Sequence, residues 1–231
     1  MVVDAKSNEI TAIPKLLEIL DISGSLVTID AMGCQTEIAK QIVAQGADYC
    51  LSAKGNQPTL HNGMVDFFYD HLGDNFARTK SRRHHTEEKG HGRDEVRDYI
   101  ICPVPDDLPD RARWPMLCAI GMAMSYIIRD GKECFETRYY ILSKYLSAKR
   151  FAEGVRSHWG IENSLHWQLD VTFREDECRI RQGHADANFS ILRRTSLSLL
   201  KQETTAGVGI KNKRLIAAWD ESYLEKVLFG T

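Results

Sequence analysis

The 231-residue sequence predicts an α/β fold that is interrupted by an all-β insertion and completed by helices. In the first part of the chain, helix and strand signals alternate across short turns marked by glycine, an order typical of parallel strands covered by helices. Strand and turn signals then dominate up to about residue 145, and helical periodicity returns after it. We therefore expect three parts: residues 1–75, 76–145 and 146–231.

The first part contains three expected helices and two expected strands. Apolar residues at helical spacing, among them Ile13 and Leu17, predict a helix that ends near Leu20. β-branched residues predict a short strand at 26–29, and Gly46 precedes a second apolar run. The elements expected in order are that helix, strand 26–29, a helix capped by Thr36, strand 47–51 and a helix that ends near His71.

The expected insertion begins with a strongly polar segment. Residues 76–98 contain seven Lys or Arg, five Asp or Glu and three His, which predicts an exposed hairpin or a mobile loop. Three strands should follow, at 99–102, after Trp114 and at 138–141, with a hairpin turn at Asp130-Gly131. Helices are then expected at about 147–168, 186–201 and 221–229.

The composition excludes several classes of protein. Thirty Lys and Arg stand against 32 Asp and Glu, so a protein that binds nucleic acid by bulk positive charge is excluded, whereas one with local basic patches is not. Six cysteines without a CxxC pair fit neither a zinc knuckle nor a disulfide scaffold. The longest apolar run has 15 residues and contains Pro115 and Gly121, too short for a membrane span. Because the N-terminus lacks an apolar segment of the signal-peptide kind, we expect a cytoplasmic protein.

Two residues follow the expected parallel strands. Asp30 comes directly after the first strand, and Lys54 follows the second. The carboxyl ends of parallel strands are where open α/β sheets bind ligands, and a cation beside a carboxylate suits a phosphodiester substrate. The alternative is that Asp30 only caps a turn and that Lys54 is only solvated.

A second group of polar residues lies on one expected helix. His158, Glu162 and His166 are spaced four residues apart and form one stripe. Two histidines and a glutamate could ligate zinc, but three successive turns of one helix are a poor geometry for that metal. A Mg²⁺-type role for Glu162 alone and a solvated polar stripe both stay open.

Several ordered motifs along nearly the whole chain resemble the H-repeat-associated insertion-sequence transposases of bacteria, which are DDE transposases. The motifs that carry the resemblance are residues 6–10, Ile29-Asp30, residues 54–57, 91–93, 157–163 and 170–176. The resemblance implies an RNase-H-like core that is interrupted by an inserted β subdomain. Asp30 matches the second acidic residue of the family, and Glu162 matches the last.

The resemblance also implies the chemistry. Two Mg²⁺ or Mn²⁺ ions held by Asp30, Glu162 and a further carboxylate would support cleavage and strand transfer of DNA. This predicts that the carboxylates of Asp30 and Glu162 lie within roughly 8 Å of each other. His158 would contact DNA or orient Glu162. The residues expected to contact DNA phosphates are Lys54, Arg78, Arg82, Arg83, Arg93 and Arg97, with His158.

The first acidic residue of the family has no counterpart in this sequence, because the motif that follows it begins at Lys6. We therefore expect a copy truncated at its N-terminus, with an incomplete core. The strand that ends at Asp30 should have an unpaired edge, which favours a homo-oligomer. Low stability and no DNA cleavage by the isolated chain are expected as well. The alternatives are a non-catalytic DNA-binding or dimerisation remnant and a zinc hydrolase built on His158 and His166.

Overall fold

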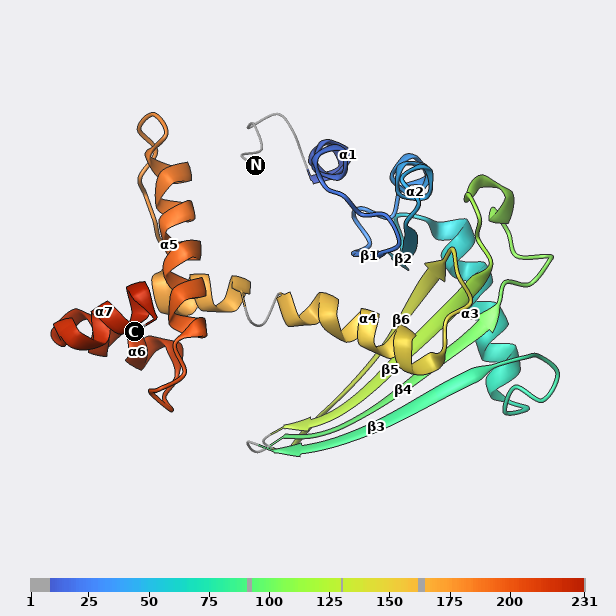
Figure 1. Ribbon diagram of the computed structural model, residues 1–231. Coiled ribbons are helices and arrows are strands. Elements are labelled where there is room, and N and C mark those ends of the chain that lie inside the picture. The colour runs from blue at the N-terminus through green and yellow to red at the C-terminus, as the bar shows by residue number, and fades with distance from the viewer. Residues whose placement is uncertain (1–8, 91–92, 130, 162–164, 231) are drawn as a thin grey trace. The chain divides into compact units, whose positions relative to one another are not determined.

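The computed structural model describes residues 9–90, 93–129, 131–161 and 165–230. The chain divides into two compact units, Met1–His158 and Trp159–Thr231, which are treated separately below. Figure 1 shows strands in the first unit, whereas the described part of the second unit is helical.

One six-stranded sheet forms the first unit, in the order β1-β2-β6-β5-β4-β3. β1 and β2 are parallel, and every other neighbouring pair is antiparallel. The expected β region therefore continues the sheet of β1 and β2, because β6 pairs directly with β2. The strands are β1 (Leu26–Ile29), β2 (Asp48–Ala53), β3 (Arg82–Gly90), β4 (Arg93–Pro103), β5 (Ala119–Arg129) and β6 (Lys132–Leu142).

Apart from Ile210–Trp219, where no helix was expected, the helices lie close to their expected positions. The segment 76–98, expected to be an exposed hairpin or a mobile loop, forms part of the β hairpin of β3 and β4. The helix α7 begins and ends where it was expected. The prediction that Thr36 caps α2 is wrong, because Gln35 is the N-cap residue and Thr36 begins the helix. The helices are α1 (Glu9–Ile19), α2 (Thr36–Ala44), α3 (Pro58–Leu72), α4 (Ala148–Ile161), α5 (Ala185–Gln202), α6 (Ile210–Trp219) and α7 (Glu221–Phe229), with a π-helix at Gln168–Thr172.

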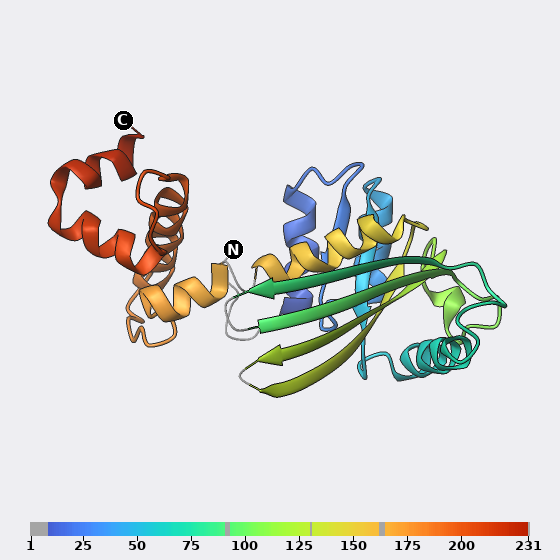
Figure 2. The same ribbon diagram turned by 90° about the horizontal axis from the view of Figure 1, so that it is seen from below.

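The two faces of the sheet carry different helices. Side chains alternate along β2, so Tyr49 and Leu51 join the apolar core that also contains residues of α1, α2 and α3. On the opposite face, α4 packs with Phe151 against Tyr140, at a ring-centroid distance of 5.4 Å. Figure 2 shows α4 lying along the sheet, with its C-terminal end on the side of the hairpin ends.

β1 is the edge strand of this sheet. Among the described strands, β2 alone pairs with it, through the register Leu26↔Asp48 to Ile29↔Leu51. α4 covers one face of β1, because a Cβ at Gly154 would lie 3.2 Å from Cδ2 of Leu26. The outer edge of β1 therefore presents backbone groups without a partner among the described residues.

The second unit has a small core with a buried carboxylate at its centre. Leu200, Tyr223 and Val227 form the apolar part. Glu203 is 7% exposed and accepts a hydrogen bond from Tyr223 Oη at 2.6 Å, while Lys213 Nζ lies 3.4 Å from Glu203 Oε2. These contacts link the end of α5 to α6 and α7, and α6 itself lies between the last two helices that the sequence predicted, where no helix was expected.

Candidate metal and nucleic-acid site

Asp30 lies in the turn that directly follows β1 and is exposed. Its Oδ1 accepts a hydrogen bond from the backbone N–H of Gly33 at 3.2 Å, so the carboxylate does cap the turn. Gly33 is needed at this close approach, because a Cβ there would lie 2.3 Å from Cγ2 of Ile29. The side chain thus combines a structural contact with an accessible carboxylate.

The turn after β1 is joined to the turn after β2. The side chain of Asn56 donates to the carbonyl of Ala31, and Gln57 Nε2 donates to the carbonyl of Cys34 at 3.0 Å. Gln57 is 9% exposed, so its side-chain amide forms a hydrogen bond within the protein and is not available to a ligand. The two strand ends therefore form one rim, as the sequence predicted, and Lys54 extends from it as an exposed cation.

The helix-borne candidates are described only in part. Glu162 lies outside the described residues, so its expected distance to Asp30 is not defined by this structure. His158 is half-buried near the end of α4, and His166 is exposed in the second unit. Within the described part of the chain, no group of three or more His, Cys, Asp or Glu residues is arranged to hold a metal ion. The described residues therefore give a zinc centre no support.

Four arginines expected to bind DNA make contacts within the protein. Arg78 pairs with Asp74. Arg82 Nη1 donates to the carbonyls of Tyr145 and Leu146 at 2.9 and 2.8 Å, and its guanidinium lies 4.0 Å from the centre of the Tyr145 ring.

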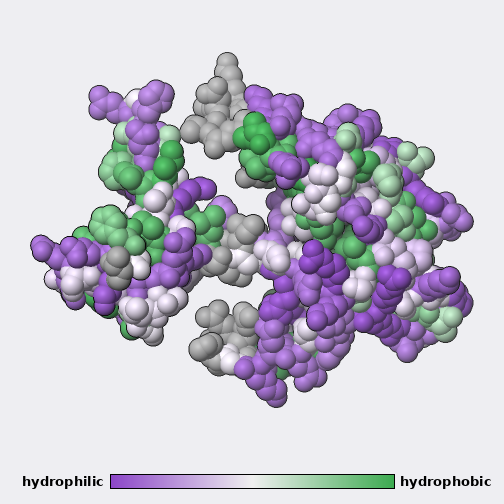
Figure 3. Space-filling model, in the orientation of Figure 1, coloured by the Kyte–Doolittle hydropathy of each residue, from purple (hydrophilic) through white to green (hydrophobic). Residues whose placement is uncertain are grey.

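Arg83 Nη1 likewise donates to Asn75 Oδ1 at 2.6 Å, and the Arg83 guanidinium stacks on the Phe76 ring. Arg97 forms ion pairs with Glu95 and Glu88, and the side chain of Arg93 lies outside the described part. Figure 3 shows hydrophilic residues over β3 and β4, but their charges are largely paired. The sequence could not show this pairing, because the carbonyls that bind Arg82 lie 63 and 64 residues further along the chain, and the nearer partners of Arg78, Arg83 and Arg97 meet them only in the folded turn and strands.

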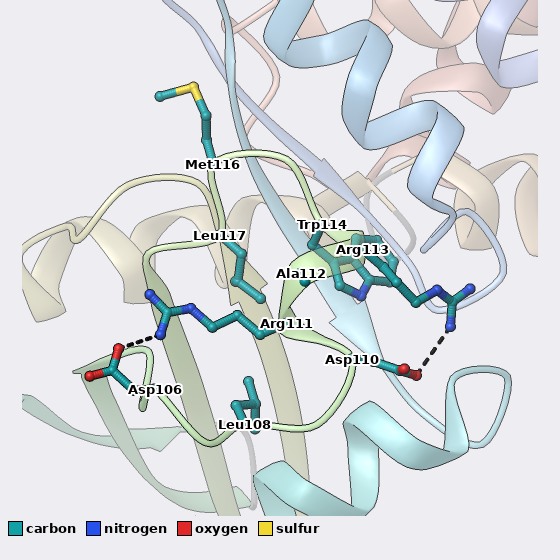
Figure 4. Close-up of a pocket in the computed structure, with 9 residues that line it drawn as sticks. All are labelled: Asp106, Leu108, Asp110, Arg111, Ala112, Arg113, Trp114, Met116 and Leu117. Carbon is teal, nitrogen blue, oxygen red and sulfur yellow. Dashed lines mark hydrogen bonds and ion pairs between the residues drawn. The ribbon is translucent and has the colours of Figure 1, made fainter.

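A pocket of about 550 Å³ lies in the connection between β4 and β5 (Figure 4). Two ion pairs flank it, Arg111 with Asp106 at 2.5 Å and Arg113 with Asp110 at 3.1 Å. Trp114 lines it with a buried indole N–H that has no hydrogen-bond partner among the described residues. None of the candidate residues named above lines this pocket. Across the described helices, none combines the length and apolar character that crossing a membrane requires.

Comparisons with known proteins identify the same family that the sequence motifs indicated. A family model described as "Transposase DDE domain" matches residues 1–199. The chain is 43% identical over 99% of its length to "Putative protein YbfL" and 42% identical over 99% to "H repeat-associated putative transposase YhhI", both of Escherichia coli strain K12. In each case the aligned part is 61% of the relative, so the chain spans about three fifths of their length.

Proposed function

Because the chain belongs to the Transposase DDE domain family, we propose that it supplies catalytic residues of a bacterial insertion-sequence transposase. The observation that carries this proposal is the family match over residues 1–199, which includes both Asp30 and Glu162. The proposed reaction is phosphoryl transfer, in which water or a DNA 3′-hydroxyl attacks a phosphorus atom of the DNA backbone while the bond from that phosphorus to one of its two ester oxygens breaks and that oxygen leaves.

Asp30 and Glu162 are the proposed carboxylate ligands of divalent Mg²⁺ or Mn²⁺. The exposed carboxylate of Asp30 fits such an ion, because hard oxygen donors are the ligands that Mg²⁺ and Mn²⁺ prefer. Bound ions of this kind activate the attacking oxygen and stabilise the leaving oxygen. The hydrogen bond from Gly33 N–H fixes the orientation of the Asp30 carboxylate before any ligand binds.

Lys54 is the proposed phosphate contact nearest to Asp30 along the rim. Its side chain is exposed, and the loop that carries it is held to the Asp30 turn by Asn56 and Gln57. Arg93 and His158 are proposed as further DNA contacts. Arg78, Arg82, Arg83 and Arg97 would have to exchange protein partners for phosphates, so we propose a smaller role for them.

Self-association through the outer edge of β1 is also proposed. That edge has no partner among the described strands, and an exposed edge favours pairing with a second chain. Sedimentation velocity across a hundredfold concentration range tests this: a mass that rises with concentration supports pairing, and a constant monomer mass contradicts it.

Metal binding and DNA nicking by the purified chain test the catalytic proposal. We expect Asp30→Asn and Glu162→Gln each to weaken Mn²⁺ binding by about tenfold or more, because each removes a charged ligand. Asp107→Asn, which changes an exposed carboxylate in the β4–β5 connection, is the matched control and should leave Mn²⁺ affinity unchanged.

Unchanged Mn²⁺ affinity in both site variants contradicts the proposal. Metal-dependent nicking of supercoiled DNA that is lost in Asp30→Asn would show that the chain is catalytic by itself. Such nicking would also exclude a purely DNA-binding role.

A further inference from the structure

The turn that carries Asp30 is closed by hydrogen bonds within itself. β1 ends at the preceding residue, so Asp30 lies beyond the ladder that joins β1 to β2. The N–H of Gly33 donates to Asp30 Oδ1 at 3.2 Å. The N–H of Cys34 donates to the carbonyl of Ala31, also at 3.2 Å. Local bonds of this kind set the shape of a turn, but they do not set its position relative to a neighbouring loop.

Two consecutive side chains of the loop after β2 supply that position. The amide of Asn56 donates to the carbonyl of Ala31 across 25 residues of sequence. Gln57 Nε2 donates to the carbonyl of Cys34 at 3.0 Å, across 23 residues. One attachment would leave the turn free to pivot, whereas two attachments fix its orientation as well as its position.

Gln57 is itself fixed on both sides. Its backbone N–H donates to the carbonyl of Lys54 at 2.9 Å, which closes the loop that carries the ammonium group. Its own carbonyl accepts a hydrogen bond from the N–H of His61 at 2.9 Å, in the first turn of α3. Because Gln57 is 9% exposed, water competes little for its amide. A short path of hydrogen bonds therefore joins the backbone of Lys54 to the turn of Asp30.

The charges of Asp30 and Lys54 are available to a ligand. Both residues are exposed, and neither forms an ion pair with another described residue. A divalent cation on the carboxylate and the ammonium group both attract the negatively charged oxygens of a phosphodiester. The rim thus presents two binding groups for one phosphodiester, on turns whose relative position is held by the Asn56 and Gln57 amides.

We propose that Asn56 and Gln57 are positioning residues that couple the binding of a divalent cation at Asp30 to the binding of a DNA phosphate at Lys54. This inference rests on the proposed function, and it adds a role that neither the motifs nor the comparisons assign to these two residues. Their action is indirect, because neither amide is proposed to touch the metal or DNA. Without the two bonds each binding group keeps its own affinity, but the turns no longer hold both groups ready for one ligand.

Three variants of the full chain test the proposal. Gln57→Met removes the buried donor and keeps a side chain of similar size, and Asn56→Ala removes the second donor at an exposed position. Gln41→Met is the matched control, because Gln41 Nε2 donates to the carbonyl of Pro14 at 2.8 Å, a bond of the same kind across 27 residues that joins α2 to α1. Circular dichroism checks the folding of each variant, and Asn56→Ala keeps the test valid if Gln57→Met does not fold.

The coupling is measured as a ratio of two affinities. Fluorescence anisotropy gives the affinity for a short labelled DNA duplex with Mn²⁺ and without it, at equal ionic strength. Since coupling is reciprocal, the same ratio describes the effect of DNA on Mn²⁺ binding. The affinity for Mn²⁺ alone is measured separately, and backbone hydrogen exchange over residues 31–35 reports how firmly the turn is held.

We expect Mn²⁺ to raise the DNA affinity of the wild-type chain about tenfold, and this ratio to fall to about twofold or less in Gln57→Met and Asn56→Ala. Exchange over residues 31–35 should be about tenfold faster in both variants. The affinity for Mn²⁺ without DNA should change by less than about threefold, because the Asp30 carboxylate remains. Gln41→Met should retain the wild-type ratio and the wild-type exchange over residues 31–35.

Equal ratios in Gln57→Met and Gln41→Met overturn the proposal, even with faster exchange in Gln57→Met, because the bonds to the turn would then be structural only. A wild-type chain that binds Mn²⁺ without any gain in DNA affinity overturns it as well. A wild-type chain that binds no Mn²⁺ contradicts the proposed function itself. That result is distinguishable from the others, because it appears without DNA and before any variant is compared.

Discussion

The ring of Phe151 on α4 lies directly against Gly121 of β5. A Cβ at Gly121 would be 2.5 Å from Cζ of Phe151, closer than any real side-chain contact. The Phe151 ring also meets Tyr99 and Tyr140 edge to face, at centroid distances of 6.1 and 5.4 Å. The missing side chain at Gly121 is therefore what allows α4 to approach the sheet.

Substitution of Gly121 by alanine should lift α4 from the sheet. We expect Gly121→Ala to lower the free energy of unfolding by about 1–3 kcal/mol, the usual cost of overpacking a core. Urea unfolding followed by circular dichroism measures this change. Gly160→Ala is the control, because a Cβ at that exposed helical position would meet nothing within 4 Å and should stabilise the helix slightly. Equal effects of the two substitutions would contradict the packing argument.

The buried carboxylate of Glu203 should make the stability of the folded chain decrease as the pH falls. Hydrogen bonds from Thr205, and then from Tyr223, lower the pKa of Glu203 to about 2, from an ordinary value of about 4.5. The folded state thus favours the charged form, so this stabilisation is present above pH 4.5 and is lost as the pH falls towards 2. Melting temperatures between pH 5 and pH 2 should fall less steeply for Glu203→Gln than for the wild type.

A second glutamate of the same unit serves as the control for that experiment. Glu225 is exposed on α7, and Glu225→Gln should reproduce the wild-type dependence on pH. If Glu203→Gln also follows the wild-type curve, the hydrogen bonds to Glu203 do not couple folding to its ionisation.

Replacing Lys80 should affect DNA binding, whereas replacing Arg82 should affect stability. Lys80 is exposed ahead of β3, whereas Arg82 is bound to the carbonyls of Tyr145 and Leu146. We expect Lys80→Ala to reduce the slope of the logarithm of DNA affinity against the logarithm of salt concentration by the amount that corresponds to about one phosphate contact. The free energy of unfolding should be unchanged. Arg82→Ala should instead lower the free energy of unfolding by about 1 kcal/mol, through lost hydrogen bonds and ring stacking.

DNA titrations at several salt concentrations and urea unfolding separate these two outcomes. A loss of stability in Lys80→Ala equal to that in Arg82→Ala would contradict the assignment of a structural role to Arg82. An unchanged salt slope in Lys80→Ala would show that Lys80 makes no contact with DNA phosphates.

The six free cysteines should react at very different rates. Burial, the largest cause, raises the pKa of Cys34 and of Cys102 to about 12, and it raises the pKa of the buried Cys50 as well. Cys134 is exposed, and a hydrogen bond from Arg193 lowers the pKa of Cys178. At pH 8 a thiol reagent should label Cys134 and Cys178 rapidly, and the three buried thiols only after unfolding.

Mass spectrometry of partly labelled protein identifies the reacted positions. The variant Cys134→Ser should have one fewer rapidly labelled thiol and the same number of slowly labelled thiols. Rapid labelling of Cys50 in the folded chain would contradict the burial of β2.

The sequence predicted what depends on local periodicity and turn chemistry. The β-branched run 26–29 became β1, the run 47–51 became most of β2, and Glu221–Phe229 formed α7 with the bounds expected. Asp30 and Lys54 were expected on one rim because parallel strands end together, and the bonds from Asn56 and Gln57 join the two turns.

By itself, the sequence thus determined the kind and order of most elements and, through its motifs, the family, because these depend on neighbours a few residues apart. Only the tertiary structure decided that β6 pairs with β2 and that Arg82, Arg83 and Arg97 form hydrogen bonds or ion pairs within the protein. The pairing of Glu88 with Arg156 spans 68 residues, and no local pattern encodes it. Such contacts exist only after the chain has folded, because the partner of a charge is set by which strands and helices pack together.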